Sequence, residues 1–506
     1  MITLNGNDLT LADINNVARQ NEQVNLAPAA CDKVNKCREF VEKLVREGTI
    51  VYGLTTGFGK FSNITIPAGK LAELQKNLIL SHATGIGPFL GREETRAAML
   101  LRANVLAKGH SGARLCILEL IVNMLNNGIH PLIPEKGSVG ASGDLAPLSH
   151  LVLVMLGRGQ AEFKGKTCSG RVALTRAGLK PVILQAKEGL ALNNGTQIMT
   201  SIIALSLLKA INLAVTADIC AALSADALLS TPDAFSSLIH NLRPYPGQLR
   251  ASRNISNLLQ NSELRKSHLG CKNVQDPYSI RCAAQVHGAV RDSLEHVRSI
   301  IETEINSATD NPLIFPVEGK VLSGGNFHGE PVAFAGDILG FSVSELGNIA
   351  ERRCEQLLNP ALNRGLKPFL APRPGLDSGF MISQLTAASL VSENKILAHP
   401  ASVDSIPTSA NQEDHVSMGP VAAVKARNIM DNTAYVLAIE LIIACQALEE
   451  RKYSSSPALM AIKEIIRDHV KPLTKDRELS EDIEKMKKLV ESEILADSAR
   501  KYITLE

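Results

Sequence analysis

The chain of 506 residues contains no tryptophan and few other aromatic residues, 12 Phe and 6 Tyr. It also lacks an excess of charge, because 53 basic residues stand against 51 acidic ones and the formal net charge is +2. A near-neutral chain has no broad basic field, which argues against a nucleic-acid partner. With 45% hydrophobic and 21% charged residues, the composition predicts a folded globular protein.

Cysteine and histidine are not spaced as metal ligands. The nine cysteines are an odd number without a C-x-x-C pair, and the 12 histidines include no H-x-H or H-x-x-x-H pair. The cysteines stand at positions 31, 37, 116, 168, 220, 271, 282, 354 and 445. These spacings predict neither a disulfide framework nor a metal site.

The sequence shows no export signal and no clear membrane segment. Residues 1–8 lack a basic stretch followed by an apolar one, so we expect a cytoplasmic protein that does not contact a membrane. The most apolar stretch, residues 189–208, contains the polar run 193–197, which would be costly in hydrocarbon. We therefore predict a buried core helix over 189–208.

Hydrophobic periodicity predicts a mainly α-helical protein. Apolar residues recur every three or four positions from Val286 to Ile305, which places one stripe on one long helix. Further helices are predicted over residues 198–230, 331–358 and 416–450, and a charged pair of helices across 457–500. Gly- and Pro-rich stretches at 53–59, 85–88 and 137–147 predict loops between short elements.

The change of pattern divides the chain into two parts. Residues 1–196 form a loop-rich, partly helical N-terminal part, and residues 197–506 form a bundle of long helices with a helical C-terminal part. Wide apolar stripes on long helices favour packing between subunits.

Two Gly-rich loops come close to known motifs but lack essential residues. In residues 53–61, GLTTGFGKF, a P-loop would need glycine at Leu54 and Ser or Thr at Phe61. In residues 140–144, GASGD, a hydrolase nucleophile elbow would need glycine at Asp144 and a preceding strand, for which residues 131–140 are poor material. A nucleotide-binding protein or a helical scaffold, with loops that only turn the chain, is the alternative of another class.

The run of residues 137–150, GSVGASGDLAPLSH, suits an unusual reaction. Gly143 leaves its amide nitrogen unhindered and its backbone free to bend, so this nitrogen can approach the carbonyl of Ala141 across Ser142. The simpler interpretation is a helix N-terminus with Asp144 as cap and Gly143 as turn. Taken alone, the run favours the helix terminus.

Eight motifs in order along the chain resemble those of the aromatic amino-acid ammonia-lyase family, which includes histidine, phenylalanine and tyrosine ammonia-lyases and related aminomutases. The Ala141-Ser142-Gly143 loop is one of them, and the resemblance covers about residues 50–430. The other seven motifs are YGLTTGFG at 52–59, SHATG at 81–85, LNNGTQ at 192–197, QDPYSIR at 275–281, DNP at 310–312, SGGNFHGE at 323–330 and NQEDH at 411–415.

The resemblance implies that Ala141, Ser142 and Gly143 cyclise with loss of two waters to a 4-methylideneimidazole-5-one group, with no metal or nucleotide. Elimination of ammonia needs a strong electrophile that no ordinary side chain supplies. The resemblance also implies a homotetramer with active sites shared between subunits. The proposed site residues are scattered from 52 to 413, so we expect one interdependent module.

The resemblance assigns roles to individual residues. Tyr52 is implied as the base for the β-proton, and Tyr278 as the group that assists departure of the amine. Arg281 has the planar guanidinium that binds a carboxylate with two hydrogen bonds. Contacts to the prosthetic group are implied for Asn194, Gln275 and Phe327.

Two residues favour histidine as the substrate. His82, in the Ser81-His82 pair, suits an imidazole, and Glu413 can accept an imidazole N–H where phenylalanine-type relatives carry a neutral amide. The expected reaction converts L-histidine to trans-urocanate and ammonia, the first step of histidine degradation. A phenylalanine or tyrosine lyase or aminomutase is the alternative within the family. Asn193 and Tyr245 depart from the family pattern, and either could reshape the pocket.

Overall fold

The computed structural model describes residues 1–270 and 274–506, and Cys271 of the cysteine set lies outside these residues. The described residues form 20 α-helices and nine short strands, as the mainly α prediction requires. They group into two compact units, each built from three segments of the chain. Unit 1 comprises 1–205, 298–337 and 400–424, and unit 2 comprises 206–297, 338–399 and 425–506. The division at residue 197 follows chain order and stays a prediction.

Unit 1 combines helices with four small sheets. Its helices are α1 (Leu11–Arg19), α2 (Pro28–Arg46), α3 (Leu71–His82), α4 (Arg92–Ala107), α5 (Leu115–Asn126), α6 (Leu145–Met155), α7 (Gly170–Arg176) and α8 (Glu188–Asn193). Its strands are β1 (Ile2–Leu4), β2 (Val24–Leu26), β3 (Ile86–Phe89), β4 (Ile129–Pro131), β5 (Pro134–Lys136), β6 (Gln160–Phe163), β7 (Lys166–Ser169), β8 (Leu313–Phe315) and β9 (Lys320–Leu322). Strands β1 and β2 pair in parallel, and β3–β5, β4–β6–β7 and β8–β9 pair antiparallel.

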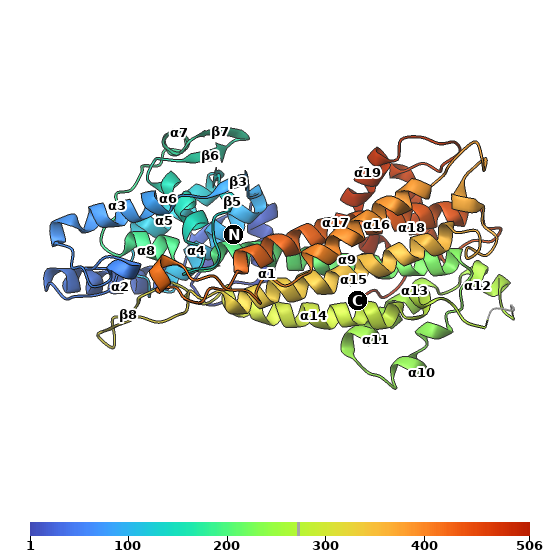
Figure 1. The fold of residues 1–506 in the computed structure, drawn as a ribbon, viewed down its shortest axis with the longest axis horizontal. Coiled ribbons are helices and arrows are strands. Elements are labelled where there is room, and N and C mark those ends of the chain that lie inside the picture. Colours follow the sequence, from blue (N-terminus) through green and yellow to red (C-terminus); the bar gives the residue numbers. More distant parts are fainter. Residues whose placement is uncertain (271–273) are drawn as a thin grey trace. The chain divides into compact units, whose positions relative to one another are not determined.

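Four long helices have residues in both units. They are α9 (Gln197–Ala227), α14 (Ala283–Glu304), α15 (Glu330–Leu358) and α17 (Gly419–Glu449). All four match helices predicted from periodicity. Within unit 2 they run alongside one another (Figure 1). Glu440 of α17 accepts hydrogen bonds from Ser224 of α9 at 2.7 Å and from Arg353 of α15 at 2.8 Å, so paired polar groups join the buried faces.

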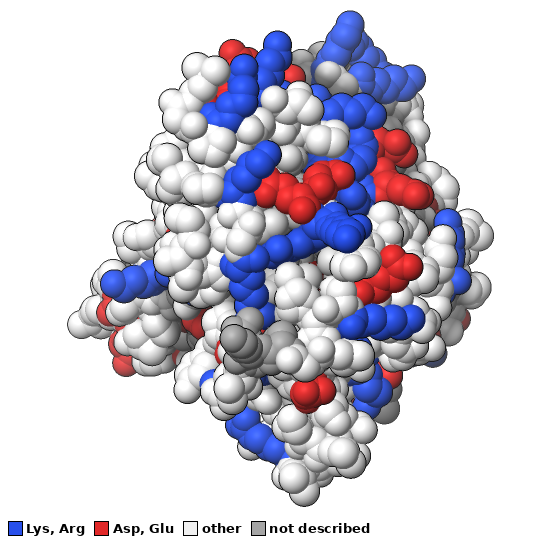
Figure 2. All heavy atoms as spheres, turned by 90° about the vertical axis from the view of Figure 1, so that its right-hand side faces the viewer, with Lys and Arg blue, Asp and Glu red and all other residues white. Residues whose placement is uncertain are grey.

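Unit 2 is completed by shorter helices. They are α10 (Ser237–His240), α11 (Pro246–Leu258), α12 (Glu263–Ser267), α13 (Tyr278–Arg281), α16 (Met381–Leu397), α18 (Pro457–His469), α19 (Ser480–Glu491) and α20 (Ile494–Arg500). The predicted charged pair across 457–500 is therefore three helices, because the chain turns between residues 491 and 494. On the face drawn in Figure 2, basic side chains lie beside acidic ones, in keeping with the near-zero net charge.

The prediction of one core helix over residues 189–208 is wrong in one respect. Helix α8 ends at Asn193, and α9 begins only at Gln197. Gly195 has a φ of +137°, and a Cβ at this position would lie 2.7 Å from the buried Arg102 guanidinium. The break therefore requires glycine. Because Asn194 lies in this break, its buried side chain can turn toward the Ser142 carbonyl.

One predicted loop of unit 1, and one stretch judged poor strand material, contain strands. Most of the stretch 85–88 belongs to β3, and residues 134–136, judged poor strand material, form β5. The two short strands pair with each other antiparallel, with Ile86 opposite Lys136 and an irregular register. Such short strands carry too little periodicity to be recognised from sequence alone.

Two helices are long and apolar enough to span a membrane by composition. They are α9 and α17, and 78% of the most apolar stretch of each is buried inside the protein. Burial of this extent is typical of core helices in globular proteins. The eight cysteines within the described residues are free thiols.

Candidate active site

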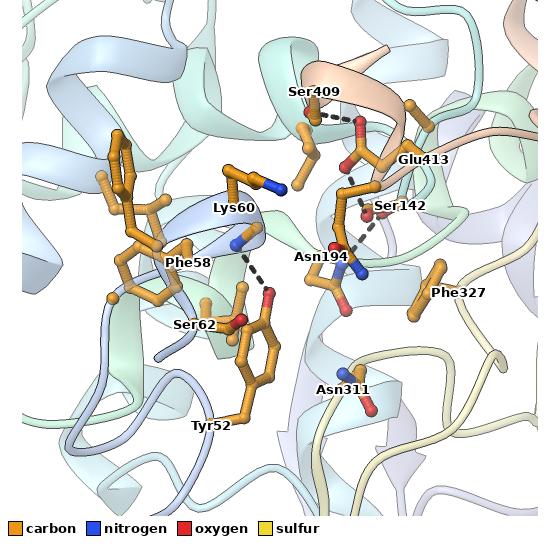
Figure 3. A pocket seen from close by; sticks show the side chains of 18 of the residues that line it. Tyr52, Phe58, Lys60, Ser62, Ser142, Asn194, Asn311, Phe327, Ser409 and Glu413 are labelled. Carbon is orange, nitrogen blue, oxygen red and sulfur yellow. Dashed lines mark hydrogen bonds between the residues drawn. The ribbon is translucent and has the colours of Figure 1, made fainter. Parts of the chain in front are cut away.

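A cavity of about 1200 Å³ in unit 1 collects most of the predicted site residues. It is lined by seven of them: Tyr52, His82, Ala141, Ser142, Asn194, Phe327 and Glu413. These residues come from six separate stretches of sequence, all within the three segments of unit 1. In Figure 3, Tyr52 and Phe327 face the space beside Ser142 and Asn194 from different sides.

The loop with Ala141, Ser142 and Gly143 is a tight turn before α6. The Gly143 amide donates to the Gly140 carbonyl at 3.3 Å, and Ser142 has a φ of +53°, in the left-handed region. Gly143 has a φ of +79°, and a Cβ on it would lie 2.2 Å from the carbonyl oxygen of Gly195. Only glycine fits at this position, because it combines a positive φ with a close approach to a neighbouring backbone.

Asn194 holds the turn from the other side. Its side-chain amide donates to the carbonyl of Ser142 at 3.0 Å, and the Asp144 amide donates to the carbonyl of Gly195 at 2.7 Å (Figure 3). The break between α8 and α9 thus lies directly against the Ala-Ser-Gly turn. On α4, the buried Arg102 fixes this break through its guanidinium, which donates to the carbonyls of Ala191 and Asn194 at 3.0 Å each.

Asp144 does not cap the helix that follows it, which corrects the simpler interpretation of the run. Its side chain makes no capping hydrogen bond to α6. Instead, its carboxylate accepts from the backbone amides of Ile198 and Met199, at 2.7 and 3.1 Å, in the first turn of α9. Complete burial raises the pKa of Asp144 to about 7, partly offset by these two hydrogen bonds.

Glu413 and His82 form a polar part of the cavity wall. The Ser142 hydroxyl donates to Glu413 at 3.1 Å, and the hydroxyls of Thr408 and Ser409 donate to the other carboxylate oxygen at 2.7 and 2.6 Å. His82 is the last residue of α3. Burial lowers its pKa, and the nearby Glu413 carboxylate raises it in part. An imidazole and a carboxyl group therefore line the same cavity.

Tyr52 is presented by the Gly-rich loop after α2. Its hydroxyl accepts a hydrogen bond from the Gly59 amide at 3.2 Å, which turns the ring into the cavity (Figure 3). Leu54 anchors the loop, because it is 1% exposed and packs in a cluster with Val41 of α2 and Leu71 of α3. The glycines of this stretch therefore shape the site instead of cradling phosphate.

Gly143 lies in the turn beside the cavity, whereas the last three predicted residues, Gln275, Tyr278 and Arg281, lie in unit 2 and do not line the cavity. Gln275 and Tyr278 are exposed, and the Arg281 guanidinium lies 4.7 Å from the centre of the Tyr278 ring. Within the described residues Arg281 has no carboxylate partner, and its Nε is buried without a hydrogen bond. The structure thus does not support a surface ion pair for Arg281.

The two departures from the family pattern also lie outside the cavity lining. Asn193 is buried, and its amide donates to Ser149 of α6 at 3.2 Å. Tyr245 is 54% exposed in unit 2, next to Arg243. Neither residue contributes to the cavity wall.

Sequence reasoning missed several cavity residues. Lys60, Asn311, His328 and His415 line the cavity, although no role was assigned to any of them. Asn311 accepts from the Gly324 amide at 2.8 Å, so it holds the loop that precedes Phe327. Lys60 lies in the stretch for which a P-loop was rejected, and the other three lie in motifs shared with the family. The sequence therefore pointed to these positions but did not indicate what their side chains do.

Comparison with known proteins agrees with this arrangement. The profile of the family described as "Aromatic amino acid lyase" matches residues 9–468. The chain belongs to this family. The predicted enzyme class, a carbon–nitrogen lyase, is confirmed.

Individual relatives cover the whole chain. A histidine ammonia-lyase of Natranaerobius thermophilus is 52% identical over 506 residues, 99% of both chains. Among solved structures, a histidine ammonia-lyase from Trypanosoma cruzi is 42% identical, with a TM-score of 0.92 and coverage of 99% of this chain and 96% of the other. A tyrosine aminomutase from Streptomyces globisporus is 37% identical, with a TM-score of 0.94 and complete coverage of both chains.

Proposed function

We propose that the enzyme converts L-histidine to trans-urocanate and ammonia, the first step of histidine degradation. In this reaction the bond between the α-carbon and nitrogen breaks, a proton leaves the β-carbon, and a double bond forms between the two carbons. The observation that carries the proposal is that Glu413 and His82 line the same cavity, in which the Ser142 hydroxyl donates a hydrogen bond to Glu413. Relatives named histidine ammonia-lyases, about half identical along the chain, support it.

The residues around Ser142 fit a methylideneimidazolone group formed from Ala141, Ser142 and Gly143. The turn already bends the Gly143 amide back along the chain, and Gly143 has no Cβ to obstruct that bend. Asn194 would hold the group through the carbonyl of Ser142, where its amide already donates. When formed, the group supplies the electrophile that makes the substrate amine a better leaving group.

Side chains of this cavity would then orient the substrate and move its proton. Glu413 accepts the imidazole N–H, which is a charge-assisted hydrogen bond, and His82 offers its ring as a second polar partner. Tyr52, once it has given up its own hydroxyl proton, takes the β-proton at its ring oxygen, which already points into the cavity. Phe327 closes the wall on the far side of Ser142 and excludes water from that side.

The substrate carboxylate requires a cation, and the only Lys or Arg among the described residues that line the cavity is Lys60. We propose that Arg281, Tyr278 and Gln275 reach the cavity from other copies of the chain in a homotetramer. The exposure of Gln275 and Tyr278 in unit 2, and the lack of a carboxylate partner for Arg281 among the described residues, support this. We also propose a cytoplasmic location, with which burial of both long apolar helices is consistent.

A parallel substrate assay tests the proposed reaction. L-histidine, L-tyrosine and L-phenylalanine are incubated with the enzyme, and near-ultraviolet absorption follows the unsaturated product of each. We expect urocanate from L-histidine and little product from the other two. Absence of urocanate would reject the substrate, and a β-amino acid product would favour an aminomutase, the activity named for one structural relative.

Two further measurements test the prosthetic group and the shared site. Intact mass should show a chain two waters lighter than its sequence, whereas a full-weight chain would exclude the group. Tyr52→Phe and Arg281→Gln chains, each inactive alone, should regain activity when they are unfolded together and refolded as mixed tetramers. If mixing restores nothing, each site is built from one chain.

A further inference from the structure

Three side chains that commonly bind metals meet at the wall of the cavity. His328 precedes α15, Glu330 is the first residue of that helix, and His415 lies shortly before α17. One ligand atom from each lies within 4.8 Å of the other two. The Nε2 atom of His328 is 3.4 Å from Nδ1 of His415, and the two rings are stacked with centres 5.5 Å apart.

One oxygen of the Glu330 carboxylate lacks a hydrogen-bond partner within the described residues. Its Oε2 atom is buried and has no hydrogen-bond partner among the described residues. The nearest cationic candidate, Nδ1 of His328, is 3.8 Å away, which is too far for a hydrogen bond. A buried carboxylate oxygen without a partner costs free energy, because it has lost water and gained nothing in return.

A metal ion would satisfy all three groups. We propose that His328, Glu330 and His415 bind a divalent transition-metal ion of the zinc class. Two imidazoles and one carboxylate are a donor set that Zn²⁺ accepts, with a fourth position left open. Because His328 and His415 both line the cavity, the open position would face its interior and take water or a donor atom of a bound molecule.

The spacing of the two imidazoles agrees with such a site. Two Zn–N bonds of about 2.1 Å at the tetrahedral angle place the nitrogens roughly 3.4 Å apart. His328 and His415 have this separation, at 3.4 Å. The carboxylate oxygen lies up to 4.8 Å from a ligand nitrogen, so rotation about the Glu330 side-chain bonds must bring it closer.

This inference departs from the expectation of no metal that the sequence supported. Metal motifs are recognised when ligands lie a few residues apart on one element. Here the two histidines are 87 residues apart, and only the fold of unit 1 brings them together.

Zinc binding to the full-length protein tests the proposal. The purified enzyme is treated with a chelator, desalted and titrated with Zn²⁺ by calorimetry, and Co²⁺ is then added to record the visible bands of a four-coordinate site. We expect one Zn²⁺ per chain. The variants His415→Gln and Glu330→Gln should each weaken binding by about 100-fold or more, since each removes one of three protein ligands.

A matched control separates this site from adventitious binding. His469→Gln removes an exposed histidine at the end of α18, where its Nδ1 is 2.9 Å from the Ile465 carbonyl; within the described part of the chain it belongs to no cluster of three possible ligands. This variant should bind Zn²⁺ as the parent does. Far-ultraviolet circular dichroism and the thermal midpoint establish that each variant is folded.

Two results would overturn the proposal. One is a parent protein that binds no stoichiometric Zn²⁺, in which case His328 and His415 share only a hydrogen bond. The other is unchanged affinity in both His415→Gln and Glu330→Gln, which would place any bound metal elsewhere. Neither readout depends on lyase activity, so failure here is distinct from failure of the proposed reaction.

Discussion

Replacement of Gly143 by alanine probes the closest backbone contact in the site. Gly143 has a φ of +79°, and an added Cβ would lie 2.2 Å from the carbonyl oxygen of Gly195. This carbonyl accepts the hydrogen bond from the Asp144 amide at 2.7 Å. The substitution should therefore strain the turn at Gly143 and also push this turn away from the backbone at Gly195.

The expected loss of stability has three sources. An L-residue in the left-handed region costs about 1–2 kcal/mol. Loss of the hydrogen bond between Asp144 and Gly195 costs about 1 kcal/mol. Relief of a 2.2 Å overlap against buried backbone costs about 1–3 kcal/mol, as other overpacked sites do. We expect Gly143→Ala to lower the free energy of unfolding by roughly 3–6 kcal/mol.

Gly165→Ala is the matched control for backbone strain alone. Gly165 has a φ of +74° in the same unit, but a Cβ there would meet nothing within 4 Å. Its replacement should cost only the left-handed strain, about 1–2 kcal/mol. Both substitutions are made in a Ser142→Ala background, so that no chain can form the prosthetic group.

Thermal and urea unfolding, followed by circular dichroism, measure both losses. The thermal midpoint and the urea midpoint of Gly143→Ala should both fall well below those of Gly165→Ala. Equal midpoints would refute the reasoning, because the approach to Gly195 would then contribute nothing beyond the positive φ.

Three further changes test neighbouring groups. Ser142→Gly removes the hydroxyl lost during processing, so turnover should vanish and intact mass should show at most one water lost. Glu413→Gln should lower kcat/KM for L-histidine about 10-fold or more through loss of a charge-assisted hydrogen bond, whereas Asp404→Asn, at an exposed residue outside the cavity lining, should not. Burial raises the pKa of Asp144 from 3.8 to about 7, so the folded chain retains a proton that the unfolded chain releases between these values. Stability should therefore fall by up to about 4 kcal/mol as pH rises through this window, and Asp144→Asn should flatten the fall in urea titrations; an unchanged slope would contradict the assignment.

Much of the helical architecture was predictable because long amphipathic stripes repeat over many residues. The stripe from Val286 to Ile305 falls on α14, which spans Ala283–Glu304. Short elements were not predictable, since three or four residues such as β5 hold too little pattern. The break at Gly195 was also missed, because its cause is Arg102, 93 positions earlier in the chain.

Taken alone, the residues of the Ala-Ser-Gly loop favoured a helix terminus, although Gly143 leaves its amide nitrogen free to bend back; the chemistry of the loop was implied only by the resemblance to the family. The order of eight motifs then identified the family, which the comparisons confirm. The sequence by itself thus determined the helical class and the family.

Only the tertiary structure decided which residues share a cavity and which partners they find there. Tyr52, Ser142 and Glu413 converge although they lie far apart in the chain, whereas Tyr278 and Arg281 belong to the other unit. Asp144 caps α9 instead of its own helix, and His328 meets His415 across 87 positions. Contacts of this kind depend on the packing of distant segments, which local sequence patterns do not encode.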